Sequence, residues 1–410
     1  AKFEELVNKI NDLIENRVEL NLKHISKTLL VDIQSDTAFT LDQFVTMQEK
    51  VTKRKTQMMD AKNLEVERAV EDLINVVLSF PLEDAGGAQI SDDTIQKLRD
   101  HYSRLMYLAI LNTTKNSFHT LKKRLASRTT GGFMFIDKPF FDVNVELSLP
   151  IVTMNPSLEE IQLAINRCAI NVLKCSKRIC QWGQDRELPI ERLQTFHALI
   201  AQDREIVKVV LLLTGSVEGT KKQVHDYLQT FMSYEHLWKV DKQAKYKEFM
   251  ATEPDLESFD NELKKYVDME ASIMSIPAVH NIGCMSLETN PVKSSLRSEA
   301  VAWKSQYSKN LHAQAREEML QLQDMMKETL QKLDRPLNDL DDVRDVMAVL
   351  KFIREKESEI DYQIVPIEEK YHLLAKNEVH VDKEEFDDLN ALRESWRKVK
   401  TQAMVASDKL

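Results

Sequence analysis

Residues 215–222 read GSVEGTKK, and their glycines and lysines could form a phosphate-binding loop. That loop requires four residues between its glycines, a Ser or Thr after its lysine, and a buried strand before it. Here only three residues separate Gly215 from Gly219, Lys222 follows Lys221, and no strand pattern precedes them. We therefore expect no nucleotide site, and we expect the two glycines to mark a flexible or closely packed point in a helix.

Histidine and cysteine side chains could bind a metal or form disulfides. The 10 histidines include no pair at metal-ligand spacing, and the sequence has no His-Glu-x-x-His or Cys-x-x-Cys. The 4 cysteines are too few for a disulfide framework. Cys168 and Cys175 lie on an apolar stripe, whereas Cys180 and Cys284 are isolated. We expect core thiols and a reducing, cytosolic compartment.

Acidic side chains gather near one expected helix start, and they could bind a cation. They lack the glycine and the terminal glutamate that shape a calcium loop, and their position instead matches the positive end of a helix dipole. No nucleophile-elbow sequence is present. The sequence therefore predicts no catalytic, cofactor-binding or metal-binding residue. The acidic residues are Asp339, Asp341, Asp342 and Asp345.

The net charge of −10 gives no general electrostatic basis for binding nucleic acid. Two basic runs, at residues 53–55 and 122–124, are interpreted as solvated helix faces. We expect no signal peptide, and no apolar run approaches the ~18 residues that span a bilayer. We expect no membrane, nucleic-acid or small-molecule partner. The chain starts with helical sequence and no Met, which is typical of a segment of a larger protein.

These residues must be positioned by long helices. The 410 residues are 43% hydrophobic and 30% charged, with only 8 Gly and 10 Pro. Few turn residues and many charges indicate long amphipathic helices. No repeat of ~34 to 47 residues is visible, so successive unequal bundles are favoured over a regular solenoid.

The strongest helical pattern runs from Asp339 to Leu374. Its apolar residues alternate steps of three and four, which indicates a heptad seam packed lengthwise on other helices. The pattern breaks once, at Glu357, and Pro366 lies one residue off the seam, where we expect a kink. The seam consists of Val346, Leu350, Ile353, Ile360, Ile364, Ile367, Tyr371 and Leu374.

Other helices are predicted over residues 1–34, 40–80, 91–128, 157–182 and 189–238, then after Pro254, before Pro336, and around 386–399. Thr40 with Gln43, and Ser157 with Glu160, match the capping-box pattern. In the 157–182 segment the apolar spacing continues to Trp182, and Gly183 is expected to cap the helix. The four tryptophans are expected to pack in cores, with anchoring of a partner as the alternative.

Residues 141–149 show the clearest strand pattern, with apolar and polar residues in strict alternation. A lone strand is unstable, so it needs partners. Phe133–Ile136 and Val279–Leu287 are the candidates, and we expect a small antiparallel sheet that uses both.

The predicted fold is mainly α: an elongated series of helical bundles with long heptad-patterned helices and one small antiparallel β element. The expected divisions are an N-terminal bundle of long helices at 1–128 and a β-containing insertion at 129–156. A central bundle at 157–290, with a second strand near 279–287, and a C-terminal bundle at 291–410 follow.

Several stretches resemble the tail of dynein heavy chains, in the region before the linker. The most specific is RPLNDLDDVRDVMAVLKFIREKESEIDYQIVPIEEKYHLL at 335–374. NPSLEEIQLAINRCAINVLKCSKRICQWGQ at 155–184, YEHLWKVD at 234–241, EAVAWKSQYSKNL at 299–311 and FDDLNALRESWRKV at 386–399 are similar to the axonemal branch. PFFDVNVELSLPIVTM at 139–154 is also typical of the family. Together these stretches cover about residues 130–410, and the nearest likeness is to outer-arm chains of the gamma type.

The resemblance implies a structural tail segment whose C-terminal bundle leads towards the linker. It implies other dynein heavy chains, intermediate and light chains and axonemal docking proteins as partners. It also implies a location in the cytoplasm, cytoskeleton and cilium axoneme. ATP and Mg would belong to a motor ring downstream, since the ring's motifs have no counterpart here. Two other interpretations stay open: a general cytoskeletal scaffold or tether, and an enzyme with an unrecognised site.

Overall fold

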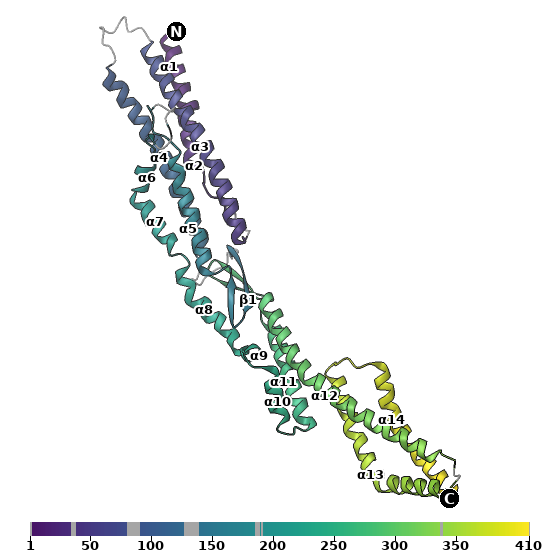
Figure 1. Ribbon diagram of the computed structural model, residues 1–410. Coiled ribbons are helices and arrows are strands. Elements are labelled where there is room, and N and C mark those ends of the chain that lie inside the picture. Colours follow the sequence, from purple (N-terminus) through teal and green to yellow (C-terminus); the bar gives the residue numbers. More distant parts are fainter. Residues whose placement is uncertain are drawn as a thin grey trace. The chain divides into compact units, whose positions relative to one another are not determined.

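The computed structural model describes residues 2–33, 38–79, 91–126, 139–184, 189, 192–336 and 339–409. These residues form two compact units. The first contains Ala1–Met232 and Pro277–Val292, and the second contains Ser233–Ile276 and Lys293–Leu410. Helices dominate both units, as the composition predicts (Figure 1).

The first helical stretch is continuous but changes type. It consists of α1 (Lys2–Asp12), a π-helical segment (Leu13–Glu19) and α2 (Leu20–Lys27). The apolar residues Leu13 and Val18 are five apart, and both are buried. A π turn bonds i to i+5, so it keeps these two side chains on one face where an α-helix would separate them. The helix ends at Lys27, short of the predicted residue 34.

Two long helices follow as predicted. α3 (Leu41–Leu78) begins with the capping box of Thr40 and Gln43, and α4 (Asp92–Leu125) begins with Ser91 as its N-cap. Helix α2 packs on α4, and the π-helical segment packs on α3.

α5 (Leu158–Lys174) begins with the predicted capping box of Ser157 and Glu160. The predicted continuation to Trp182 is wrong, because α5 passes into a 3-10 turn (Cys175–Lys177) and the helix ends there. Ile179 and Cys180 are nevertheless buried, and Cys180 forms an isolated bridge with Thr195. Buried residues in this non-helical segment thus happen to follow the spacing of a helix.

The predicted helix at 189–238 is broken into short pieces: α6 (His197–Ala201), α7 (Arg204–Thr214), a 3-10 turn (Glu218–Thr220) and α8 (Lys221–Thr230). Gly215 ends α7 instead of lying inside a longer helix, and the expected close packing is absent, because a Cβ at Gly215 or Gly219 would meet nothing within 4 Å. Val207 on α7 is 44% exposed, so the helix buries a different face. Its buried residues are Ile206, Val209 and Leu213.

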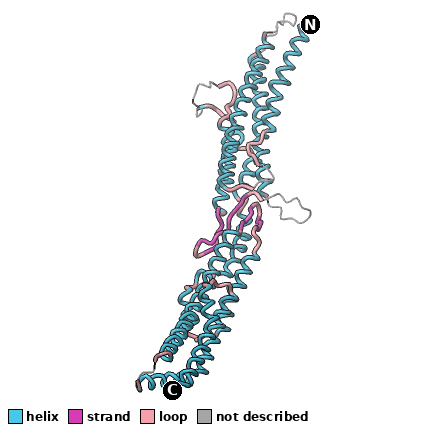
Figure 2. Tube along the Cα trace, turned by 90° about the vertical axis from the view of Figure 1, so that its right-hand side faces the viewer, coloured by secondary structure: helices cyan, strands magenta, loops and turns pink. Residues whose placement is uncertain are grey.

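The small sheet has four strands in the order β2-β1-β4-β3, drawn in magenta in Figure 2. They are β1 (Phe141–Ser148), β2 (Ile151–Asn155), β3 (Val279–Ile282) and β4 (Met285–Glu288). Both hairpins are antiparallel, but β1 and β4 pair in parallel, so the sheet is mixed and the wholly antiparallel expectation is wrong. The segment 279–287 takes part as predicted, whereas Phe133–Ile136 lies outside the described residues.

An aromatic cluster joins the sheet to α3. Phe44 on α3 contacts Phe140 and Phe141 edge-to-face, with ring centroids 5.3 Å apart in each pair. Phe39, just before α3, forms an isolated parallel β-bridge with Phe141, and its backbone N–H donates a hydrogen bond to the Phe140 carbonyl. Edge-to-face pairs add to the burial of these rings.

The second unit is built from α9 (His236–Lys239), α10 (Lys242–Met250), α11 (Leu256–Ser275), most of α12 (Asn290–Leu333), α13 (Leu340–Lys376) and α14 (Lys383–Lys409). Trp303 on α12 is 2% exposed, stacks on Tyr266 of α11, and donates its indole N–H to the Leu237 carbonyl at 2.8 Å. The predicted core role therefore holds for Trp303, and it also holds for the buried Trp396 of α14.

Candidate functional site

The heptad seam lies on α13, and the structure buries all of its predicted apolar residues. Their exposed fractions run from 0% at Tyr371 to 9% at Leu350. The carboxylates of Asp341 and Asp342 fall in the first turn of α13, and Asp339 is its N-cap. These three acidic residues therefore stabilise a helix start, as predicted, whereas Asp345 lies beyond the first turn.

Helix α14 packs on α13 through a seam of its own. Its buried positions alternate steps of four and three without a break: Glu385, Leu389, Leu392, Trp396, Val399, Ala403 and Ala406. Ion pairs join the helices: the Arg393 guanidinium lies 2.6 Å from the Glu368 carboxylate, and the Lys400 ammonium lies 3.4 Å from the Glu357 carboxylate. The later residue on α14 thus pairs with the earlier residue on α13. The helices are therefore antiparallel, and the heptads pair within this chain.

Glu357, the one polar intrusion in the seam, is exposed and reaches Lys400 of α14. Lys400 also lies 3.3 Å from Asp361. A carboxylate at this position keeps its solvent contact and still links the helices. The break in the apolar pattern is thus a bridge between helices at the edge of the seam.

Pro366 lies inside α13, and the helix continues through it. Proline has no N–H, so the carbonyl four residues earlier, at Tyr362, loses its usual donor. Pro366 also lines a groove of about 540 Å³ between α12 and α13, together with Phe352, Met325 and Lys370. The apolar side chains Phe352 and Tyr362 are 40% and 77% exposed beside it.

A buried polar cluster connects three helices of the bundle. Glu385 of α14 is 7% exposed and accepts hydrogen bonds at Oε1 from the Tyr371 hydroxyl of α13 and from Nε2 of His312 on α12, the latter at 2.8 Å. Burial acts to raise the pKa of Glu385, but these hydrogen bonds, together with the charges of His312 and Arg316, outweigh it and hold that pKa below its usual value. Burial also raises the pKa of Tyr371, and its bond to Glu385 adds to the effect.

A second buried contact fixes α13 against α12. The Lys370 ammonium lies 2.6 Å and 2.7 Å from the two carboxylate oxygens of Glu318. The Lys370 side chain is 11% exposed. Breaking such a pair leaves a buried charge, so the pair specifies how the helices align even where its net stabilisation is small.

Sequence reasoning missed this cluster. The helix predicted around 386–399 begins its pattern one residue too late, because Glu385 occupies the buried position and Phe386 is half-buried. The available signal was the four-residue step from position 385 to Leu389, which continues the heptad upstream. His312 and Lys370 carried no signal, since their roles depend on three helices meeting.

The other candidate sites have structural explanations. The segment 215–222 follows a helix, α7, and its Lys221 pairs with Glu218. Burial raises the pKa of Cys168 to about 12 and that of Cys175 to about 11, which agrees with core thiols. Of the basic run at 122–124, Arg124 is half-buried with its guanidinium over the Phe140 ring, so only the two lysines are solvated.

Within the described ranges, no group of three or more His, Cys, Asp or Glu side chains could hold a metal ion. In the same part of the chain, no helix is long and apolar enough to cross a membrane. The absence of catalytic and cofactor residues stays a prediction. The charges and hydrogen bonds of this arrangement join helices to one another.

Residues 305–410, which contain more than half of α12 and all of α13 and α14, match the family model for the coiled coil of dynein axonemal heavy chains 2, 5 and 8. The whole chain aligns at 48% identity with the dynein gamma chain of the flagellar outer arm of Chlamydomonas reinhardtii. The chain belongs to the axonemal dynein heavy chains. Mouse axonemal heavy chains 8 and 5 also align over the full chain, at 29% and 26% identity.

These matches confirm the resemblance seen in the sequence. They also extend it, because the alignment to the gamma chain covers 100% of this chain and so includes the first 130 residues. The chain spans 9% of that gamma chain and 10% of mouse heavy chain 8. It therefore corresponds to a small part of such a protein, and the matched family is that of a coiled-coil region and not of a motor ring.

Proposed function

We propose that this chain is a structural segment of the tail of an axonemal dynein heavy chain, upstream of the linker. It supports the assembly of heavy, intermediate and light chains, docking on the axonemal doublet, and the transmission of force. The main support is the bundle of α12, α13 and α14, which matches the dynein coiled-coil family. Buried seams and a buried polar cluster join its three helices.

Force transmission requires that neighbouring helices do not slide past one another. The antiparallel seams of α13 and α14 bury apolar residues along both helices. Sliding of one helix would move each buried side chain out of the space between the residues of the facing helix. The cluster at Glu385 adds a directional contact that only one alignment satisfies. Both features support a stiff element.

We propose the cilium axoneme as the location, because the relatives are named as axonemal and flagellar outer-arm chains. The proposed partners are the other dynein heavy chains, the intermediate and light chains, and axonemal docking proteins. ATP and Mg would bind elsewhere in the parent chain, and this segment would turn over no nucleotide.

The test replaces the matching segment of the C. reinhardtii gamma chain by this chain in cells that lack the gamma chain. The expected result is recovery of outer arms on isolated axonemes and of normal beat frequency. With Ile364→Asp, which places a charge in the seam, arm recovery is expected to fall several-fold. Val365→Asp, on the exposed side of the same helix, is the matched control.

Normal arm assembly with the segment deleted would overturn the proposed role. A general cytoskeletal scaffold is the second candidate, supported only by the helical architecture, and it predicts that the chimeric chain fails to enter outer arms. An enzyme is the third, and ATP hydrolysis by the purified 410-residue chain, above the rate of a buffer control, would support it.

A further inference from the structure

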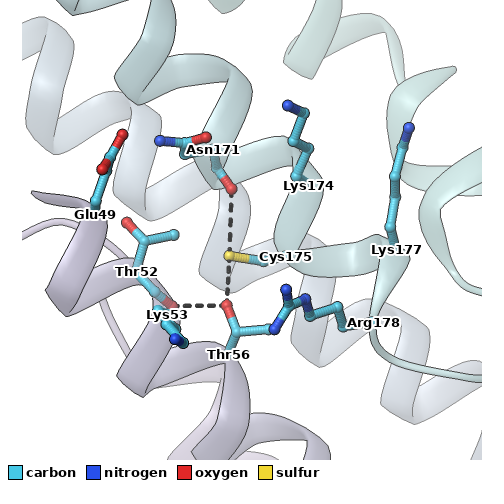
Figure 3. Close-up of a pocket in the computed structure, with 9 residues that line it drawn as sticks. All are labelled: Glu49, Thr52, Lys53, Thr56, Asn171, Lys174, Cys175, Lys177 and Arg178. Carbon is cyan, nitrogen blue, oxygen red and sulfur yellow. Dashed lines mark hydrogen bonds between the residues drawn. The ribbon is translucent and has the colours of Figure 1, made fainter.

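A cavity of about 420 Å³ lies in the first unit between α3 and the end of α5 (Figure 3). Its wall of α3 includes Thr52, Thr56 and Lys53, and Cys175 lies at the centre of the view. Both threonines and Cys175 are buried, while the lysines and the arginine around them are exposed and Glu49 is half-buried. The cavity thus has a neutral floor and a charged rim.

The floor is already satisfied. Thr56 Oγ1 lies 2.7 Å from the Thr52 carbonyl oxygen and 2.8 Å from Cys175 Sγ. Thr52 donates its hydroxyl to the Leu30 carbonyl at 3.0 Å. Because these groups have partners inside the protein, the floor offers little to a ligand, and recognition must come from the rim.

The rim is strongly basic. Its cations are Lys53, Lys174, Lys177 and Arg178. The one acidic residue that lines the cavity, Glu49, forms an ion pair with Arg167, whose guanidinium lies 2.6 Å from the Glu49 carboxylate. Among the residues that the structure describes, no carboxylate lies within ion-pair distance of those four cations. Uncompensated cations around one cavity favour an anionic partner, although the chain as a whole carries a net charge of −10.

The exposed face of α5 leads to this basic rim and is partly apolar. Leu163 and Ile170 are 66% and 49% exposed, although the opposite face of α5 is buried in the core. Leu163, Arg167, Ile170 and Lys174 are spaced by four, three and four residues, so they share one stripe. Apolar and basic positions alternate along it. A heptad stripe of this kind is the complement of a helix that carries apolar and acidic residues.

We propose that the outer stripe of α5 and the basic rim beside it bind an acidic amphipathic helix of a partner subunit. Leu163 and Ile170 anchor the partner's apolar positions, while Lys174, Lys177 and Arg178 receive its carboxylates. The inference deepens the proposed function and rests on it, because it assigns one assembly contact to a named surface.

The first experiment uses outer-arm complexes that carry this chain. Lysine acylation followed by mass spectrometry compares the complex with the isolated chain. Lys174 and Lys177 are expected to react several-fold more slowly in the complex, and a zero-length carbodiimide cross-linker is expected to join them to Asp or Glu of another subunit. Lys122 and Lys123, exposed on α4, serve as control positions with unchanged rates.

The outcomes separate the two proposals. If the chain enters the complex but Lys174 and Lys177 stay as reactive as in isolation, this inference is overturned and the tail role stands. If the chain does not enter the complex, the tail role fails and this inference fails with it.

A second measurement tests the chemistry directly. The probe is a synthetic three-heptad helical peptide with Leu at its seam positions and Glu beside them, and its binding to the full chain is followed by fluorescence anisotropy. Lys174→Gln with Lys177→Gln is expected to weaken binding by roughly tenfold, and raised salt is expected to weaken it further. Lys122→Gln with Lys123→Gln is the matched control, with less than a twofold change expected.

Two peptide variants decide what is recognised. Replacing the Glu residues by Gln, or the Leu residues by Ser, should each reduce binding. Equal binding of the Ser variant would show a purely electrostatic surface and overturn the amphipathic-helix proposal. Tighter binding of a single-stranded oligonucleotide than of the peptide would overturn it in favour of a polyanion site.

Discussion

The Nε2 atom of His312 lies 2.8 Å from Oε1 of Glu385, although the two residues belong to different helices and are separated by 73 positions. The same carboxylate oxygen accepts the Tyr371 hydroxyl. An ionised carboxylate has no proton to donate, so both neighbours act as donors. One buried carboxylate thereby holds α12, α13 and α14 in a single alignment, which apolar seams alone specify less sharply.

Glu385→Gln is expected to destabilise the chain at pH 7 by about 1–3 kcal/mol, because it removes a buried charged acceptor. The pKa of Glu385 is lowered in the folded state, so its stabilisation is present above the ordinary carboxyl pKa of about 4.3 and is lost as pH falls through the folded value. Urea unfolding at pH 7, 5 and 3 should show the difference from the parent chain shrinking towards acid.

The control for that measurement is Glu384→Gln, an exposed neighbour in the first turn of α14. Its effect should stay below about 1 kcal/mol, because only the helix-dipole interaction is lost. A deficit for Glu385→Gln that is the same at all three pH values would show that the charge of Glu385 is not what stabilises the bundle.

The limits of sequence reasoning follow from how far apart the interacting residues lie. The seam of α13 was predictable because its periodicity is local and every seam residue is on one helix. The parallel pairing of Phe141 with Met285 was not, because no local pattern encodes a partner that distant. The end of α5 was misjudged since Ile179 and Trp182 keep a helical spacing while lying in a turn region. The cluster at Glu385 needed the packing of three helices.

Ile364→Asp is expected to reduce the free energy of unfolding by about 3–5 kcal/mol, because it buries an unpaired charge in the seam. Ile364 is 2% exposed, whereas its neighbour Val365 is 39% exposed. Val365→Asp should therefore change stability by less than about 1 kcal/mol. Thermal melting of the two variants gives the comparison, and equal melting temperatures would mean that the seam is not packed as described.

The four cysteines are expected to resist alkylation in the folded chain. All are buried, and burial raises the pKa of Cys284, like that of Cys175, to about 11. Because the thiolate is the reactive form, iodoacetamide at pH 8 should modify them at least about 100-fold more slowly than in urea. Mass spectrometry of the alkylated peptides measures this site by site. Rapid native labelling of any one of them would place that thiol outside the core.

The π-helical segment between α1 and α2 predicts that one deletion will keep or raise the melting temperature, whereas most deletions inside a helix lower it. Leu13 and Val18 are five residues apart and both are buried in a segment that packs on α3, whereas a regular α-helix would turn two residues at this spacing to different faces. Deleting Glu15, which is exposed, would bring them to four apart and restore a regular 3-4 pattern through the whole stretch. The deletion variant is therefore expected to form a continuous α-helix and to melt at the same or a higher temperature.

Deletion of Glu65 is the matched control, because this residue is also exposed but lies in the regular helix α3. Removing one residue there rotates everything beyond it by about 100° and takes Val66 and Val70 off the buried face. That variant should lose several kcal/mol of stability or fail to fold. If the two deletions were equally damaging, the π turn would be needed for more than keeping two apolar residues in register, and the spacing argument would be wrong.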